Sequence, residues 1–436
     1  MAIIKPLQGF RFNTEKVGNM SSVITPPYDV IDGEAQAKFY EANPYNIIRL
    51  ELGKKYPDDN EEHNVYTRAA STFAEWCLKE VLVKETEPAF YLYQQEYQVY
   101  GETKTRTGFI WTIKAEDYAK GQVMPHEETL PKHKKDRLEL MRATESNFSP
   151  IFGLYSDPNK IIDKSLLAAV GERKPDIDVT DWAGEKHRVW VVSDPEAINT
   201  VVRTMDKFKI YIADGHHRYE TAAAYGQEMK YKGKRDFDYM LITLVNLFDE
   251  GLVVLPTHRL VKNMNNFDFA KFLSDVKSSF QVIPIPATDS KEEMLKKLLE
   301  EMAEAGNSSH AFGLYGGENM YLLKLRNDQA IEEVTDEAKS QAWRHLDVTI
   351  LHSLILEKLL GIGAKERASE EFLKYTREDL AAIEAVDQGD CQIAFLMNPT
   401  KVQEVTAVAE AGEKMPQKST FFYPKVISGL VINKLG

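Results

Sequence analysis

The sequence predicts an α+β fold with β-hairpins and a more helical C-terminal part. Residues 208–225, FKIYIADGHHRYETAAAY, begin as a β-prone run and end in helix-forming alanines. Residues 89–115 alternate apolar and polar positions on both sides of Gly101-Glu102, which is typical of a hairpin. From residue 265 onward the patterns become mostly helical, and we expect helices over residues 267–279, 291–305 and 346–360.

We expect two lobes with a soft boundary. Residues 1–260 form a β-rich N-terminal lobe that contains the Asp-Gly-His-His-Arg turn, and residues 261–436 form an α/β C-terminal lobe. The chain has 436 residues, of which 43% are hydrophobic, so it can bury a large core. The tail, residues 414–430, combines prolines with Phe421, Phe422 and Tyr423. Disordered ends rarely have this composition, so we expect the tail to be ordered and to pack back.

Three shorter patterns complete the expected elements. Residues 60–84 have helical spacing, and residues 47–52 resemble a short strand. Residues 239–247 and 252–255 flank a Gly-containing loop, which predicts a second hairpin.

Charge and composition exclude several classes of function. The chain has 54 Lys plus Arg against 67 Asp plus Glu, a formal net charge of −13. Duplex nucleic acid as the main partner would require a basic surface, so we exclude it. The two cysteines are too few for a disulfide framework or a Cys-rich zinc site. No apolar run approaches membrane-spanning length, so we expect a cytoplasmic protein without a membrane partner.

The turn between the predicted strand and helix contains the densest set of chemical groups. Gly215 permits a tight turn or a close backbone approach, and Asp214 is placed to cap the helix. A strand that feeds a helix in this way directs backbone N–H groups and the helix dipole toward an anion. Arg218 adds a fork that grips phosphate, and His216 and His217 add titratable nitrogens. Common scaffolding remains the alternative.

Two other stretches are candidates for a site, although a structural interpretation is favoured for both. Residues 125–137 concentrate His126, Glu127, Glu128 and Arg137, which suit acid–base chemistry or Mg²⁺, but such runs are usually solvated loops. Residues 25–30, TPPYDV, are stiffened by two prolines and are favoured as a structural wrap rather than a pocket wall.

Several motifs together resemble a bacterial and archaeal family of unknown function. They are ADGHHRYETA, PPYDV, NPYNIIRLEL, HEETL, KKDRLELM, SPIFGLY, LPTHRLV, LDVTILH and KSTFFYPKVISGL. The family is domain of unknown function number one thousand and fifteen, and the resemblance covers nearly the whole chain.

The turn is also remotely similar to the phosphate-binding box of the ParB and sulfiredoxin superfamily. This resemblance implies a mixed-sheet nucleotide-binding core, with Gly215, His216, His217 and Arg218 as phosphate contacts. The superfamily includes nucleotide-dependent partition proteins, sulfiredoxin and free-serine kinases. No cysteine lies near the box in this chain, which argues against sulfinic-acid repair.

Three hypotheses about function follow. The first is a small-molecule kinase that uses ATP or ADP with Mg²⁺ to phosphorylate a hydroxylated metabolite. Its catalytic candidates are His126, Glu127, Glu128 and Asp214, with Arg137 and Arg259 as further phosphate clamps. The second is a nucleotide-binding switch or adaptor without turnover. The third is a metal-dependent hydrolase that uses His126, His216 or His217. A homodimer is an open possibility in each case.

Overall fold

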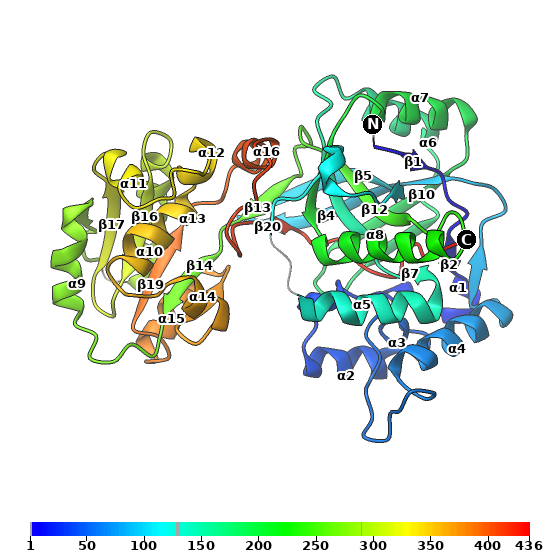
Figure 1. Ribbon diagram of the computed structural model, residues 1–436, viewed down its shortest axis with the longest axis horizontal. Coiled ribbons are helices and arrows are strands. Elements are labelled where there is room, and N and C mark those ends of the chain that lie inside the picture. The colour runs from blue at the N-terminus through cyan, green and yellow to red at the C-terminus, as the bar shows by residue number, and fades with distance from the viewer. Residues whose placement is uncertain (1, 128–130, 289) are drawn as a thin grey trace. The chain divides into compact units, whose positions relative to one another are not determined.

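The computed structural model describes residues 2–127, 131–288 and 290–436, and its fold is a mixed α+β arrangement (Figure 1). The chain forms two compact units. Unit 1 comprises residues 1–253 and 424–436, and unit 2 comprises residues 254–423. The boundary expected from the sequence lies seven residues later, at 260, and the last thirteen residues join unit 1 rather than the C-terminal lobe. No helix among the described residues is long and apolar enough to cross a bilayer.

Unit 1 is built on a mixed sheet of nine described strands. The path runs β6-β11-β8-β12-β5-β4-β10-β9, and β1 pairs with β5. β11 is parallel to β6, and β12 is parallel to β8, while the other pairs are antiparallel. The strands in chain order are β1 (Ile4–Lys5), β4 (Phe90–Val99), β5 (Glu102–Lys114), β6 (Val123–Met124), β8 (Ile151–Tyr155), β9 (Ile177–Thr180), β10 (Lys186–Val192), β11 (Ile210–Asp214) and β12 (Tyr239–Asn246).

Helices and two small strand pairs surround this sheet. In Figure 1, α8 and α5 run side by side within unit 1. The helices are α1 (Thr14–Val17), α2 (Gly33–Ala42), α3 (Ile48–Glu51), α4 (Val65–Leu78), α5 (Pro131–Thr144), α6 (Ile161–Val170), α7 (Pro195–Met205) and α8 (His216–Tyr231). The small pairs are β2 (Phe10–Phe12) with β3 (Leu82–Lys84), and β7 (Ser146–Asn147) with β21 (Asn433–Lys434).

Unit 2 is built on a six-stranded antiparallel sheet. The described strands are in the order β15-β17-β16-β19-β14-β18, and buried apolar clusters involve β14, β16, β17 and β19. The strands are β14 (His258–Val261), β15 (Phe280–Pro284), β16 (Ala311–Tyr315), β17 (Met320–Leu325), β18 (Leu373–Thr376) and β19 (Ile393–Met397). The helices are α9 (Phe269–Asp275), α10 (Lys291–Ala305), α11 (Gln329–Glu332), α12 (Gln341–Arg344), α13 (Asp347–Ile350), α14 (Ala364–Ser369), α15 (Asp379–Asp387) and α16 (Val402–Glu410).

Several predicted elements are confirmed. The first hairpin is β4 with β5, and its turn residues Tyr100 and Gly101 both have positive φ, +51° and +77°, as a type I′ turn requires. The helix expected over residues 291–305 is α10 with the same bounds. Residues 346–360 are helical as α13 followed by a π-helix, Leu351–Glu357, whose apolar side chains lie in the core of unit 2.

Two predicted elements are wrong. Residues 47–52 form the short helix α3 rather than a strand, because the Asn46 side chain accepts the Ile48 N–H and starts a helical turn. The hairpin expected across residues 239–255 does not form. β12 already has β5 and β8 on its two edges, so β13 (Val253–Leu255) pairs instead with β20 (Phe421–Tyr423).

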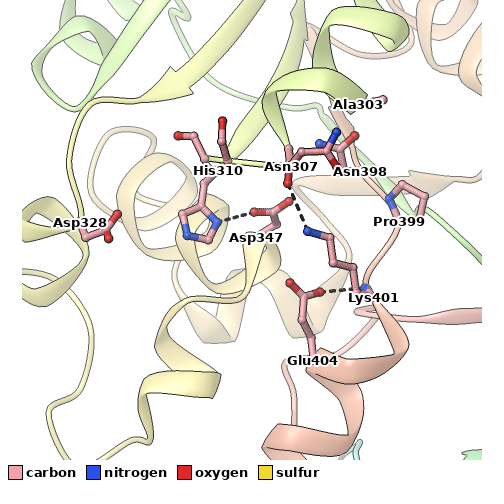
Figure 2. A pocket seen from close by; sticks show the side chains of 12 residues that line it. Ala303, Asn307, His310, Asp328, Asp347, Asn398, Pro399, Lys401 and Glu404 are labelled. Carbon is pink, nitrogen blue, oxygen red and sulfur yellow. Dashed lines mark hydrogen bonds and ion pairs between the residues drawn. The ribbon is translucent and has the colours of Figure 1, made fainter.

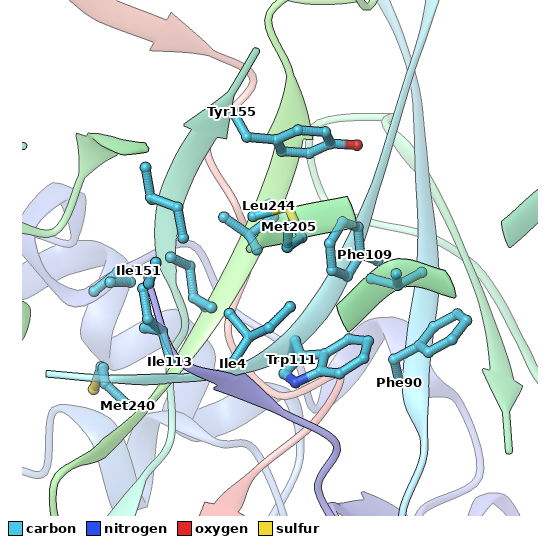
Figure 3. Close-up of a cluster of buried hydrophobic side chains, with 14 of the residues drawn as sticks. Ile4, Phe90, Phe109, Trp111, Ile113, Ile151, Tyr155, Met205, Met240 and Leu244 are labelled. Carbon is cyan, nitrogen blue, oxygen red and sulfur yellow. The ribbon is translucent and has the colours of Figure 1, made fainter. Parts of the chain in front are cut away.

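The core of unit 1 is rich in aromatic side chains that pack against the sheet (Figure 3). The Trp111 ring stacks on Phe90 with ring centroids 5.3 Å apart, and it meets Phe109 edge-on at 5.7 Å. Trp111 has no exposed surface, so its packing area is fully removed from water.

We expect Trp111→Ala to lower the free energy of unfolding of unit 1 by about 3–5 kcal/mol, because it leaves a large cavity in a rigid core. Urea unfolding followed by circular dichroism measures the change. Tyr231→Ala is the control, since Tyr231 is 95% exposed and its loss leaves no cavity. Equal effects of the two substitutions would contradict the packing described here.

Candidate functional site

The strand–turn–helix predicted around Gly215 is present in unit 1. β11 ends at Asp214 and α8 begins at His216, with Gly215 between them at φ +90°. A Cβ at this position would lie 2.9 Å from Ile151 Cγ2 and 3.0 Å from two nitrogens of the Arg218 guanidinium. Gly215 is therefore required twice, for its backbone conformation and for the approach of Arg218.

Asp214 does not cap α8, which corrects the expectation from the sequence. The N-cap residue is Gly215, which has no side chain with which to cap the helix. The Asp214 carboxylate instead accepts a hydrogen bond from Arg218 Nη2 at 2.7 Å and another from the Lys425 ammonium. Two charged partners provide a stronger interaction than the backbone N–H groups of a cap.

These partners decide the ionisation of Asp214. Burial by itself raises the pKa of this carboxyl, but the positive charges of Lys425 and Arg218 outweigh it and lower the pKa to about 2. Asp214 is consequently ionised throughout the physiological range.

The C-terminal segment that delivers Lys425 is anchored on both sides of that residue. The Pro424 carbonyl accepts a hydrogen bond from the buried Arg106 at 2.7 Å, and the Lys425 carbonyl accepts one from Gln95. Three residues later, Ser428 pairs through its backbone with Thr25 in both directions. The tail is thus ordered, as expected, and it holds the ammonium group at the end of β11.

The pairing of Thr25 with Ser428 also positions the segment that follows Thr25, Pro26-Pro27-Tyr28-Asp29, near Asp214 and Lys425. Asp29 is exposed at the surface, yet enough protein atoms surround it to desolvate it partly. Desolvation and the nearby Asp214 charge raise the pKa of Asp29, and they outweigh Arg218 and Lys425, which lower it. The two aspartates therefore have pKa values displaced in opposite directions.

Arg218 is an internal cross-link. Its side chain is only 5% exposed, and it donates to the Pro150 carbonyl at 2.6 Å as well as to Asp214. It joins the first turn of α8 to the residue that precedes β8. The phosphate contact that the sequence predicts for Arg218 would therefore be made alongside these two hydrogen bonds.

Arg137 lies close by and is also paired. It donates to the Glu51 carbonyl at 2.8 Å and to the Asp136 carboxylate, and its guanidinium lies 4.1 Å from the centroid of the Tyr28 ring. A cavity of about 30 Å³, lined by both Arg137 and Arg218, adjoins them. This volume is about the share that one water molecule occupies in liquid water.

His126 and His216 lie against each other beneath the turn, with ring centroids 4.7 Å apart. His126 Nδ1 donates to the Ile212 carbonyl, and the His126 backbone N–H donates to His216 Nε2 at 3.2 Å. These bonds fix the proton on Nδ1 of both rings when the rings are neutral. Burial lowers the pKa of His126 to about 4, so His126 is uncharged at neutral pH.

The other predicted site residues have different positions. His217 and Glu127 are partly buried near the same turn, and Glu128 lies outside the described residues. Arg259 belongs to unit 2, where it is buried on β14 and donates to the carbonyls of Thr257 and Lys418. The cluster of unit 1 does not include it.

Asp29 and Lys425 are not among the site residues that the sequence predicts. The sequence favours a structural wrap for the PPYD segment that contains Asp29. Lys425 pairs with Asp214, which is 211 residues away. No local spacing indicates a pair so distant.

We expect Gly215→Ala to destabilise the protein more than Gly233→Ala. Both glycines have positive φ, +90° and +78°, so each substitution incurs a backbone strain of about 1–3 kcal/mol. A Cβ at Gly233 meets no atom within 4 Å, whereas at Gly215 it collides with Arg218. Thermal unfolding of the two variants compares the costs, and an equal loss would show that the close approach of Arg218 is unimportant.

Comparisons with known proteins support an assignment only at the level of the family. No curated protein matches the chain. Solved structures that are similar include a free serine kinase in complex with AMP, at 15% identity and TM-score 0.34, covering 69% of this chain and 84% of that one. They also include SbnI with C-terminal truncation from Staphylococcus aureus, at 9% identity and TM-score 0.33, covering 72% and 85%.

A conserved hypothetical protein from Pyrococcus furiosus is similar at 16% identity and TM-score 0.33, covering 70% of this chain and 89% of that one. At such TM-scores these likenesses carry no conclusion about this chain. The family model described as "Protein of unknown function (DUF1015)" matches residues 4–349, and the chain belongs to this family.

Proposed function

We propose that unit 1 binds a nucleotide, ATP or ADP, at the start of α8 and transfers its terminal phosphoryl group to a small hydroxylated metabolite. The observation that carries this proposal is the cluster at the start of α8, where Asp214 pairs with Arg218 and Lys425 and the exposed Asp29 lies close enough to interact electrostatically with Asp214. Two carboxyl groups whose surroundings displace their pKa values in opposite directions are typical of an acid–base site. The ParB-like core inferred from the turn remains a prediction that agrees with this proposal.

Each group then has a separate task. Asp214 stays ionised and positions the Lys425 ammonium, while the positive end of the α8 dipole favours the negative charge of the nucleotide phosphates. Asp29 is exposed, so a substrate hydroxyl can reach it, and its raised pKa suits a general base. The hydroxyl oxygen bonds to the terminal phosphorus, the bond to the bridging oxygen breaks, and Asp29 takes the hydroxyl proton.

The charge balance of the cluster also supports a requirement for Mg²⁺. With both carboxylates ionised, Asp29, Asp214, Arg218 and Lys425 sum to zero formal charge. Nucleotide phosphates bring several negative charges, and a divalent cation neutralises them in phosphoryl transfer. Carboxylate oxygens of this kind are suitable Mg²⁺ ligands. Glu127 is the alternative base or ligand.

Thermal melting against ATP, ADP, CTP, GTP and phosphate, with and without Mg²⁺, tests the binding step. A nucleotide at roughly a hundred times its dissociation constant adds about 2.7 kcal/mol of stability and raises the melting temperature. We expect Lys425→Ala to reduce this shift and Lys232→Ala, which changes an exposed lysine at the end of α8, to preserve it. No shift with any nucleotide would exclude the proposal.

Turnover separates a kinase from a nucleotide-binding switch. We expect Asp29→Asn to lower kcat about 10²–10⁴-fold, the contribution of a general base, while nucleotide binding is retained. Asp58→Asn is the matched control at an exposed aspartate of the same unit. Binding without transfer to any hydroxylated acceptor favours the switch. Hydrolysis that depends on a metal and on His126 or His216 favours the hydrolase.

A further inference from the structure

Unit 2 contains a pocket of about 420 Å³ with its own set of polar groups (Figure 2). Its walls come from the end of α10, the start of β16 and α13, and the loop that leads into α16. Most of the lining side chains are polar, and His310, Asp328 and Asp347 are among them. The proposed function in unit 1 uses none of these residues.

His310 is held in the orientation that metal-binding histidines usually adopt. Its Nδ1 lies 2.7 Å from Asp347 Oδ1, and Figure 2 shows the ring between Asp347 and Asp328. When His310 is neutral, the carboxylate fixes the proton on Nδ1 and leaves the lone pair on Nε2. A carboxylate behind a histidine both orients the ring and makes it a better ligand.

Two further ligand groups converge on His310. One ligand atom from each of His310, Asp328 and His345 lies within 4.8 Å of the other two. In a tetrahedral zinc site, with bonds of about 2.0–2.1 Å, the ligand atoms are about 3.4 Å apart. Small side-chain movements close this difference, since Asp328 is exposed and can turn.

His345 supplies an independent observation. Its Nε2 is buried and makes no hydrogen bond with any described residue. A Glu332 carboxylate oxygen lies 3.6 Å away, at ion-pair distance when the ring is protonated. Buried polar atoms in proteins almost always have a partner. The ring of His345 thus retains capacity to bind an ion.

We propose that His310, His345 and Asp328 form a binding site for a first-row divalent transition metal ion such as Zn²⁺, and that Asp347 positions His310. Two imidazoles and one carboxylate match the preferences of zinc and its neighbours rather than those of Mg²⁺ or Ca²⁺. Three protein ligands leave a coordination position for water, and the pocket beside them has room for it.

The second group of this kind in the described chain lacks these properties. Asp181, Glu185 and His187 also lie close together in unit 1, but all are buried. Both ring nitrogens of His187 have partners, the Tyr93 hydroxyl at 2.8 Å and Asp181 at 3.2 Å. Asp181 also accepts two backbone N–H groups, so the cluster is satisfied internally.

Metal titration of the full-length protein tests the proposal. The protein is stripped with a chelator, dialysed, and titrated with Zn²⁺, and with Co²⁺ for its visible spectrum. We expect one tightly bound ion per chain. Asp328→Ala and His310→Ala should remove tight binding, and Asp347→Asn should weaken it about 10–100-fold, as expected for a residue that orients a ligand. His63→Ala, at an exposed histidine of unit 1, should have no effect.

The proposal is overturned if the wild type binds no stoichiometric ion, or if Asp328→Ala binds it as well as His63→Ala does. Asp328 is exposed, so its substitution leaves the fold intact and decides the matter even if His310→Ala fails to fold. The readout is metal content and not activity. It is therefore independent of the nucleotide site in unit 1.

Discussion

The ionised Asp214 carboxylate holds together three segments of unit 1 that are far apart in the sequence. It ends β11, it pairs with Arg218 in the first turn of α8, and it pairs with Lys425 from the last thirteen residues of the chain. A buried carboxylate without partners would be strongly destabilised, so these cations stabilise the fold of unit 1 as well as setting the charge of the cluster. Removing either one would leave Asp214 with a single cationic partner.

The same constraint extends outward through paired charges. Arg137 joins Glu51 to Asp136, and Ser149 donates to Glu51 as well. Each buried charge in this chain of contacts has a partner of opposite sign or a backbone carbonyl. Asp29 differs, because it is exposed and its charge is opposed by that of Asp214. The exposed Asp29 carboxylate is therefore the natural candidate in this cluster for reaction with a substrate.

The sequence predicts the local part of this arrangement well and the distant part poorly. A β-prone run, a glycine and three alanines suffice to predict β11, the turn and α8, because each depends on neighbouring residues. The partner of Asp214 could not be predicted, because Lys425 arrives through the packing of the tail. For the same reason the predicted hairpin between β12 and residues 252–255 is wrong. Which strands occupy the two edges of β12 depends on the whole sheet, not on neighbouring residues.

The His310 group illustrates the same limit in unit 2. Its three ligand residues occupy positions 310, 328 and 345, a spacing that matches no familiar metal motif. Only the fold places the start of β16, the residue before α11 and the residue after α12 side by side. The two units therefore present different candidate sites, one built around an ion-paired carboxylate in unit 1 and one built on two imidazoles and a carboxylate in unit 2.

The most direct test is to titrate Asp29 and Asp214 themselves by ¹³C NMR of protein labelled in its aspartate carboxyl carbons. Comparison with Asp29→Asn and Asp214→Asn assigns the two signals. We predict that Asp214 titrates near pH 2 and that Asp29 titrates above the usual range for aspartate, which is near 4. If both carboxyls titrated together near pH 4, the cations would not control Asp214, and the division of roles between the two residues would be contradicted.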